Sequence, residues 1–164
     1  MDEQTANKQN AASYKKYYVI GILILAAAVI AGAILFGNLY NRANLKANLN
    51  VVEGESYFSA EDVAAYIYKY GKLPDNYVTK GVAELSGWIG GSVETTLPGK
   101  AIGGDYFYNA AAQNNLPDAV GRIYYECDVN TQGLEGRGQE RLLYTNDGVV
   151  FYTADHYTTF TQLY

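Results

Sequence analysis

The hydrophobic positions of this chain form three blocks that differ in pattern: a continuous apolar run, a helical period and a strand period. The first block, residues 19–37 (VIGILILAAAVIAGAILFG), contains no charged side chain and is long enough to span the ~30 Å core of a bilayer as a helix. Lys15 and Lys16 precede it, and residues 38–41 after it are uncharged. Because positive flanks stay in the cytoplasm, we expect a signal-anchor with residues 1–18 as a cytoplasmic polar tail and the rest of the chain across the membrane.

Two other interpretations of this apolar block remain open. A cleaved signal peptide would use Ala31-Gly32-Ala33 as its small-residue cleavage site, although the apolar run continues for three residues beyond it. A core helix of a soluble protein fits less well, because this helix would be apolar all round. In each case residues 38–56 are expected to be a tether and residues 57–164 the folded domain.

The second block has the period of helices. Residues 59–70 carry apolar side chains at i, i+3, i+4 and i+7, which predicts a helix with one buried face. Ser59 is expected to cap its start, with Asp62 in a variant of the capping box. Gly71 is expected to end it, and Pro74 prevents it from continuing.

A second helix is predicted to begin after Thr79. Lys80 would then lie in its first turn, where a cation is unfavourable unless an anion is bound beside the free N–H groups; the alternative is an ordinary exposed lysine. The following segment, residues 87–104, is predicted to be a loop whose glycines match no dinucleotide-binding or phosphate-loop pattern. Trp88 is expected in the core rather than as a stacking platform for bases.

The third block begins at residue 121, where the period changes to two, as is typical of strands. The side chains predicted to face a core are Ile123, Tyr125, Cys127 and Val129, and those predicted to face an open surface are Arg122, Tyr124, Glu126 and Asp128. Residues 142–144 and 149–152 are predicted strands joined by an Asn-Asp-Gly turn, and residues 160–164 a last edge strand. The sequence therefore predicts an α+β domain, with N-terminal helices packed on a C-terminal antiparallel β-sheet.

Charge and cysteine content narrow the function. Cys127 is the single cysteine of the chain, so an intrachain disulfide is impossible. After Asn50 there are 15 acidic and 7 basic residues, a net charge of −8. Such a balance opposes non-specific affinity for nucleic acids, although a local cationic pocket is compatible with it.

Four side chains with catalytic potential lie between residues 121 and 157, namely Glu126, Arg137, Arg141 and the single histidine, His156. Together they offer a base, two cations and an acid that titrates near neutral pH, which is enough to move a phosphoryl group without a metal. Each also has a simpler explanation. The glutamate and the histidine are then surface residues, and the arginines pair with the nearby Glu135 and Glu140.

Local motifs favour the catalytic interpretation. Residues 72–80 (KLPDNYVTK) are similar to the KLPDNYITK segment of barnase. Further matches follow in the same order: Gly87-Trp88, Pro98-Gly99-Lys100, Ile102-Gly103-Gly104-Asp105, Gly121-Arg122, Glu126, Asp128, Asn130, Arg137, Arg141 and Asp155-His156-Tyr157. Over residues 57–164 the chain resembles the barnase-like branch of the microbial guanyl-specific ribonucleases.

This resemblance implies the microbial ribonuclease fold and an RNA endonuclease that uses neither a metal nor another cofactor. Glu126 matches the general base that takes the proton of the ribose 2′-OH, and His156 matches the general acid that protonates the leaving 5′-oxygen. The other matches are the phosphate-holding cations Lys80, Arg137 and Arg141, the active-site residue Tyr157, and Asp105, a carboxylate that helps to place the lysine and arginine. The product would be a 2′,3′-cyclic phosphate, which water then opens.

Two departures concern base recognition and the arginine loop. Relatives recognise guanine partly with a glutamate after the Gly-Gly-Asp segment, whereas residues 108–111 (YNAA) offer no carboxylate and the loop is about two residues longer. The loop before Arg137 has one extra residue. Guanine preference is therefore left open.

Three functional hypotheses follow. The first is an active, extracytoplasmic ribonuclease, secreted or anchored through residues 19–37, that acts as a monomer on single-stranded RNA. The second is a membrane-anchored module of the same fold that binds RNA or a protein with little or no catalysis. The third is an antibacterial toxin that uses the same chemistry, which would imply a polypeptide inhibitor resembling barstar.

Overall fold

The computed structural model describes residues 15, 17–34, 37, 50–110 and 116–164. The chain divides into two units, Met1–Asn41 and Arg42–Tyr164. In the first, Tyr17–Ile34 forms a helix with a mean hydropathy of 2.5, long and apolar enough to cross a membrane, although a signal sequence has the same properties. Most of the predicted polar tail and residues 38–49 of the predicted tether lie outside the described residues.

Helix α2 (Ala60–Tyr70) has the boundaries that its sequence predicts. The side chain of Ser59 accepts a hydrogen bond from the backbone N–H of Asp62, and Gly71 ends the helix in the left-handed conformation (φ 69°). Because local hydrogen bonds and backbone preferences decide both ends, the sequence alone was sufficient to place them. The shorter α3 (Lys80–Leu85) begins after the predicted cap, Thr79, whose hydroxyl accepts from the N–H of Val82.

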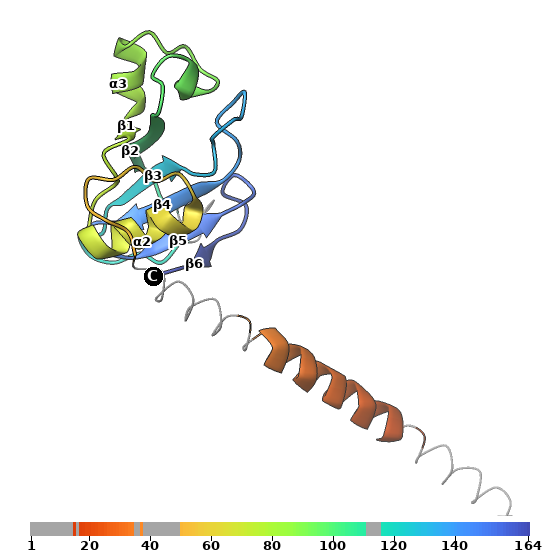
Figure 1. Ribbon diagram of the computed structural model, residues 1–164. Coiled ribbons are helices and arrows are strands. Elements are labelled where there is room, and N and C mark those ends of the chain that lie inside the picture. The colour runs from red at the N-terminus through yellow and green to blue at the C-terminus, as the bar shows by residue number, and fades with distance from the viewer. Residues whose placement is uncertain (1–14, 16, 35–36, 38–49, 111–115) are drawn as a thin grey trace, which may run out of the picture. The chain divides into compact units, whose positions relative to one another are not determined.

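Six strands form one sheet in the order in which they occur along the chain (Figure 1). They are β1 (Tyr77–Val78), β2 (Ala101–Phe107), β3 (Tyr124–Asp128), β4 (Arg141–Thr145), β5 (Val150–Thr153) and β6 (Thr161–Gln162). All neighbours are antiparallel except β1 and β2, which are parallel. The α+β prediction is confirmed, with the short β1 as an addition.

The main core lies between α2 and one face of the sheet (Figure 1). Val63 and Ile67 of the helix pack against Cys127, Leu142 and Val150 of the strands. Trp88 is buried in a separate cluster with α3 and the 3₁₀-helix η1 (Val93–Thr95), as predicted. Val51, which the sequence analysis assigned to the tether, is only 2% exposed and packs against Tyr66.

The prediction of an open surface on the second face of β3 was wrong. Tyr124, Glu126 and Asp128 are 4%, 7% and 2% exposed, whereas Ile123, predicted to face the core, is 42% exposed. Tyr124 packs in a second apolar cluster with Leu143. The two carboxylates are covered by cations and a tyrosine from other elements of the domain, a pairing that the alternation of residue types does not reveal.

Strand β2 begins at Ala101, inside the segment that was predicted to be a loop. Gly103 pairs with Cys127 and Asp105 pairs with Glu126, so β2 has one extra residue, Gly104, between these two pairs. Gly104 has φ 95°, a conformation that favours glycine. This bulge places the side chain of Asp105 on the same face as Glu126, because directly paired residues of neighbouring strands share a face.

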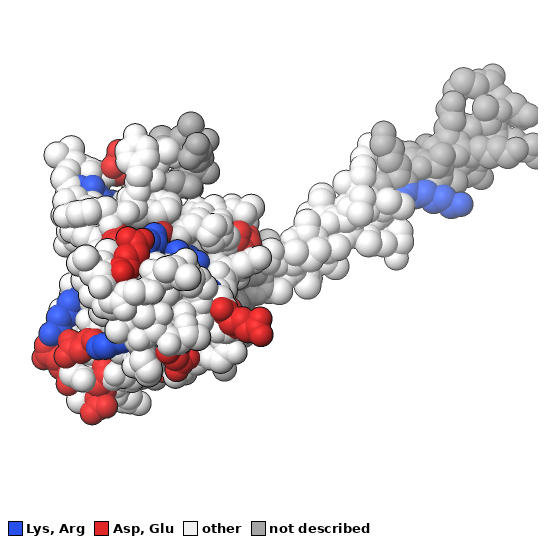
Figure 2. Space-filling model, turned by 90° about the horizontal axis from the view of Figure 1, so that it is seen from above, with Lys and Arg blue, Asp and Glu red and all other residues white. Residues whose placement is uncertain are grey.

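The surface of the domain carries acidic and basic side chains close to one another. Figure 2 shows several of the blue basic groups beside red acidic ones on the face in view. Arg122, for example, lies 2.6 Å from the carboxylate of Asp147, and Lys72 lies 2.9 Å from that of Glu53.

Candidate active site

Glu126, in the middle of β3, has a donor on each carboxylate oxygen. The Nζ atom of Lys80 donates to Oε1, and the hydroxyl of Tyr157 donates to Oε2 at 2.5 Å. These three side chains come from α3, β3 and the segment after β5. The sheet and the α3 N-terminus therefore assemble the group.

The charge state of Glu126 follows from its surroundings. Burial alone would raise its pKa, but the hydrogen bonds from Lys80 and Tyr157 and the charges of Lys80 and Arg137 bring the pKa below its ordinary value. Burial and the neighbouring carboxylate raise the pKa of Tyr157, which remains a protonated donor. Near neutral pH the site therefore holds an ionised carboxylate, ready to accept a proton.

Asp105 provides the anion that the first turn of α3 was expected to attract. Its Oδ2 accepts a 2.9 Å hydrogen bond from the backbone N–H of Lys80, while the lysine side chain turns to Glu126. The alternative of an ordinary exposed lysine is therefore wrong. The backbone N–H of Lys80 is not free to bind a phosphate, because it already donates to the carboxylate of Asp105.

Asp128 lies two residues after Glu126 and receives both arginines. Its carboxylate accepts hydrogen bonds from Nε and Nη2 of Arg137 at 2.7 and 2.8 Å. Nε of Arg141 lies 2.8 Å from Oδ1, at an angle that makes an ion pair rather than a hydrogen bond. The arginines thus pair with Asp128, and the suggested pairing with Glu135 and Glu140 was wrong.

Arg141 is the more buried of the two arginines. Its side chain is 3% exposed, compared with 25% for Arg137. Its Nη1 and Nη2 groups donate to the carbonyl oxygens of Arg137, Gly138 and Glu140. Arg141 therefore fixes the loop that carries Arg137, and Arg137 presents the more accessible positive charge.

His156 lies on a tight turn after β5 and is exposed. His156 and Tyr157 have positive φ angles of 53° and 72°, which are unusual for residues with side chains. The Asp155 carboxylate fastens the turn by accepting from Thr158 and Thr159, and these bonds, that of the Thr159 side chain foremost, lower its pKa to about 2. The ring of His156 lies 4.7 Å from that of Tyr157.

The model of the ribonuclease family matches residues 60–164 of this chain. The chain belongs to the ribonuclease family. Over 106 residues it is 42% identical to ribonucleases of Bacillus intermedius and Bacillus pumilus, a match that covers 63% of this chain and 63% of each relative. The chain thus spans about 63% of the length of these relatives. The ribonuclease of Heyndrickxia coagulans is also 42% identical over 106 residues, and there the match covers 94% of the relative.

The ribonuclease domain gathers all seven residues that the sequence analysis had selected. Lys80 and Tyr157 contact Glu126, Asp105 is paired with it across the sheet, and His156 joins through its ring contact with Tyr157. The arginines join through Asp128. Asp128 also matches the relatives but had no predicted role, although its position two residues after Glu126 places both carboxylates on one strand face.

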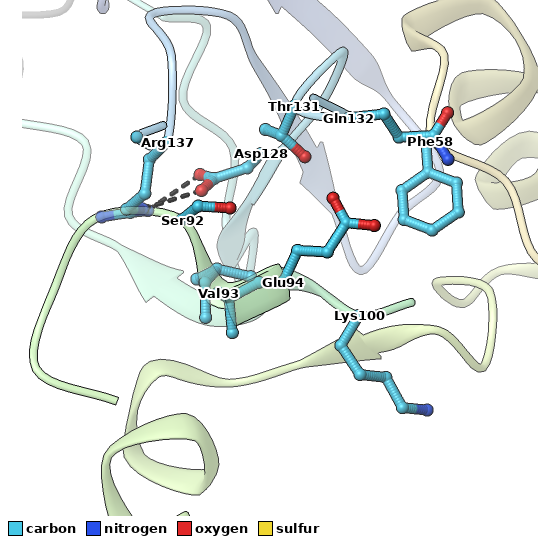
Figure 3. Close-up of a pocket in the computed structure, with 11 residues that line it drawn as sticks. Phe58, Ser92, Val93, Glu94, Lys100, Asp128, Thr131, Gln132 and Arg137 are labelled. Carbon is cyan, nitrogen blue, oxygen red and sulfur yellow. Dashed lines mark hydrogen bonds and ion pairs between the residues drawn. The ribbon is translucent and has the colours of Figure 1, made fainter. Parts of the chain in front are cut away.

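A small pocket lies beside the Arg137–Asp128 ion pair, and both residues line it (Figure 3). Ser92 and Glu94 line it, while the side chain of Lys100 points away and donates to the carbonyl of Asp75. Its free space of about 10 Å³ has room for about one water molecule. The pocket is therefore too small for a nucleotide, and the surface beside Glu126 is the better candidate for chemistry.

Proposed function

We propose that this protein is an endonuclease that cleaves single-stranded RNA without a metal. The observation that carries the proposal is the ionised carboxylate of Glu126, held between Lys80 and Tyr157 beside the arginines, in a domain of the ribonuclease family. The group combines a proton acceptor with fixed positive charge at the position where a phosphodiester would lie.

In the first step Glu126 accepts the proton of the ribose 2′-OH. The 2′-oxygen then forms a bond to phosphorus, the bond from phosphorus to the 5′-oxygen breaks, and His156 protonates that leaving oxygen. The products are a 2′,3′-cyclic phosphate and a free 5′-hydroxyl. The requirement for a 2′-OH is the reason that RNA, and not DNA, is cleaved.

In the second step the two residues exchange roles. His156 takes a proton from water, whose oxygen bonds to phosphorus, while the bond to the 2′-oxygen breaks and Glu126 returns its proton to that oxygen. Acid–base partners of this kind each contribute about 10²–10⁴-fold to the rate.

The cations hold the phosphate and the charge that develops on it. Lys80 occupies Oε1 of Glu126 in this structure, so substrate binding would transfer its Nζ from the carboxylate to a phosphate oxygen and free the base. Arg137 is oriented by Asp128 and needs no such movement. A preorganised donor at such a position is worth about 3 kcal/mol to the transition state.

Cleavage and its chemistry can be tested with one experiment. Full-length protein, purified in a mild non-ionic detergent, is incubated with a mixed-sequence RNA oligonucleotide in the presence of EDTA. We expect fragments with cyclic-phosphate ends, and their loss in Glu126→Ala and His156→Ala. Binding without cleavage by folded wild-type protein would favour the inactive binding module instead. The distribution of cut sites shows whether guanine is preferred.

For the location, we propose that the helix Tyr17–Ile34 either anchors the domain outside the membrane or is removed during secretion. Carbonate extraction distinguishes the two, because only the anchored form stays with the membrane pellet. We also propose a monomer, which light scattering of the detergent-solubilised protein tests. A barstar-like inhibitor would block the cationic site, and addition of barstar to the cleavage assay tests that expectation.

A further inference from the structure

The seven basic side chains after Asn50 are all engaged with partners in the protein. Three are paired with carboxylates, two donate to backbone carbonyls, and two do both. They are Lys69, Lys72, Lys80, Lys100, Arg122, Arg137 and Arg141. With a net charge of −8 in the same residues, little positive charge remains to attract the phosphates of an RNA strand beyond the candidate active site.

Exposed aromatic rings can bind an RNA strand in a different way, by stacking with its bases. Tyr106, Tyr125 and Tyr144 lie directly opposite one another on β2, β3 and β4, and we call these three residues the tyrosine ladder. Their ring centroids are 5.2 and 5.4 Å apart, with interplanar angles of 30° and 23°. Tyr144 packs against the core at one end, and Tyr106 is 76% exposed at the other.

The ladder and the candidate active site share β2. On either side of Tyr106 in the sequence, Asp105 accepts from Lys80 and Phe107 lies 5.2 Å from the ring of Tyr157. Because side chains alternate along a strand, Tyr106 projects from the opposite face. β1 pairs only with Ala101 and Ile102, so within the described residues no strand covers the other edge of β2 beside Tyr106.

Cross-strand aromatic pairs stabilise a sheet, but that role does not require the outermost ring to face solvent. An exposed ring backed by two others is a rigid surface on which a base of any identity can stack. We propose that Tyr106, backed by Tyr125 and Tyr144, is an accessory subsite that stacks a nucleobase of single-stranded RNA as the strand passes around the edge of β2. This proposal rests on the proposed ribonuclease function.

The test compares a short and a long substrate with full-length protein in detergent. In Tyr106→Ala, kcat/KM for a dinucleotide, which fills only the catalytic centre, should stay within about twofold of wild type. For a 12-nucleotide RNA it should fall by roughly 5- to 150-fold, since one stacked base contributes about this factor. Tyr106→Phe keeps the ring and should retain activity on both substrates.

A binding measurement separates this proposal from the proposed function. A 12-nucleotide 2′-O-methyl RNA cannot be cleaved, and its affinity for wild type, Tyr106→Ala and Tyr106→Phe is measured by fluorescence anisotropy. Loss of affinity in Tyr106→Ala alone supports the subsite even if the protein cleaves nothing. The control is Tyr68→Ala, an exposed tyrosine stacked on Tyr164. Unchanged affinity in Tyr106→Ala, an equal loss in Tyr68→Ala, or an equal loss on the dinucleotide would each overturn the proposal.

Discussion

The hydroxyl of Tyr157 donates a 2.5 Å hydrogen bond to Oε2 of Glu126, across 31 positions of the sequence. The bond stabilises the ionised form of the glutamate, whose pKa lies below its ordinary value. A base with a lowered pKa remains active to a lower pH than an unperturbed carboxylate would.

Replacement of this donor should therefore shift the acid limb of the activity profile. In Tyr157→Phe the pKa of Glu126 should rise, because the variant loses a hydrogen bond to the ionised carboxylate, an interaction worth about 1.5–3 kcal/mol. The check is kcat/KM from pH 4 to 8, with the Glu126 carboxyl followed by NMR. Tyr152→Phe is the matched control, since that hydroxyl donates to Glu140 at 2.5 Å; an equal shift in both variants would contradict the explanation.

Asp128→Asn should destabilise the domain strongly. It removes the charge that pairs with Arg137 and Arg141, and Asp128 and Arg141 are each only 2% exposed. Breaking a buried ion pair in this way costs about 3–5 kcal/mol, which urea unfolding measures. Asp147→Asn breaks the exposed pair with Arg122 and should have a much smaller effect. Equal losses of stability in the two variants would show that burial does not determine the cost of breaking an ion pair.

Gly103→Ala should disturb the contact between β2 and β3. A Cβ at this position would meet the Cβ of Cys127 and lie 2.7 Å from Cδ1 of Tyr77. We expect a loss of about 1–3 kcal/mol or more in the free energy of unfolding. Gly81→Ala has open space around the new methyl group, in helix α3, and should be neutral or stabilising by up to about 1 kcal/mol. Similar losses in both would rule out the steric explanation.

The turn that carries His156 should weaken in acid. The pKa of Asp155 is lowered to about 2, so its stabilising effect is complete above the ordinary pKa of about 4 and is lost as the pH falls towards 2. Wild type should be more stable than Asp155→Asn at pH 5 to 7, and the difference should vanish near pH 2. Thermal unfolding across this range measures it, and a constant difference would contradict the assignment.

RNA binding should depend weakly on salt. Only Lys80, Arg137 and Arg141 adjoin the candidate active site, and each phosphate contact on a single strand adds about 0.7 to the slope of log affinity against log salt. We therefore expect log affinity for the 2′-O-methyl RNA to fall with log salt concentration with a slope of about 2, measured over roughly a tenfold range of salt. A much steeper slope would mean that further basic side chains leave their partners to bind phosphates.

The parts of the fold that the sequence predicted are those decided by neighbouring residues. The ends of α2 depend on Ser59 and Gly71, and the β4–β5 turn depends on Asn146-Asp147-Gly148. Residues 101–104 of β2 were predicted to be a loop because Gly103 and Gly104 are typical of loops, whereas here they allow close strand contact and a bulge. The need for glycine at position 103 depends on the close approach of Cys127 in the neighbouring strand, which the sequence does not show.

The residues of the candidate site were proposed one by one from the resemblance to relatives. The ion pairs and hydrogen bonds that join them were not predicted. Glu126 and Asp128 were expected on an open surface because a carboxylate on an alternating strand is usually solvated. Both are buried, because Lys80 of α3 neutralises Glu126, while Arg137 and Arg141, from the loop and the strand that follow β3, neutralise Asp128. Such pairing depends on topology, and charge patterns along the chain favoured nearer partners such as Glu140.

The burial of Cys127 provides a built-in probe of native-state opening. The chain has a single thiol, which is 1% exposed between α2 and the sheet, and burial raises its pKa well above the ordinary value. A thiol reagent can therefore react only when the helix separates from the sheet or the whole domain unfolds. Labelling kinetics of the unmodified wild-type protein would report the frequency of that event inside a membrane preparation, where optical unfolding signals are hard to measure.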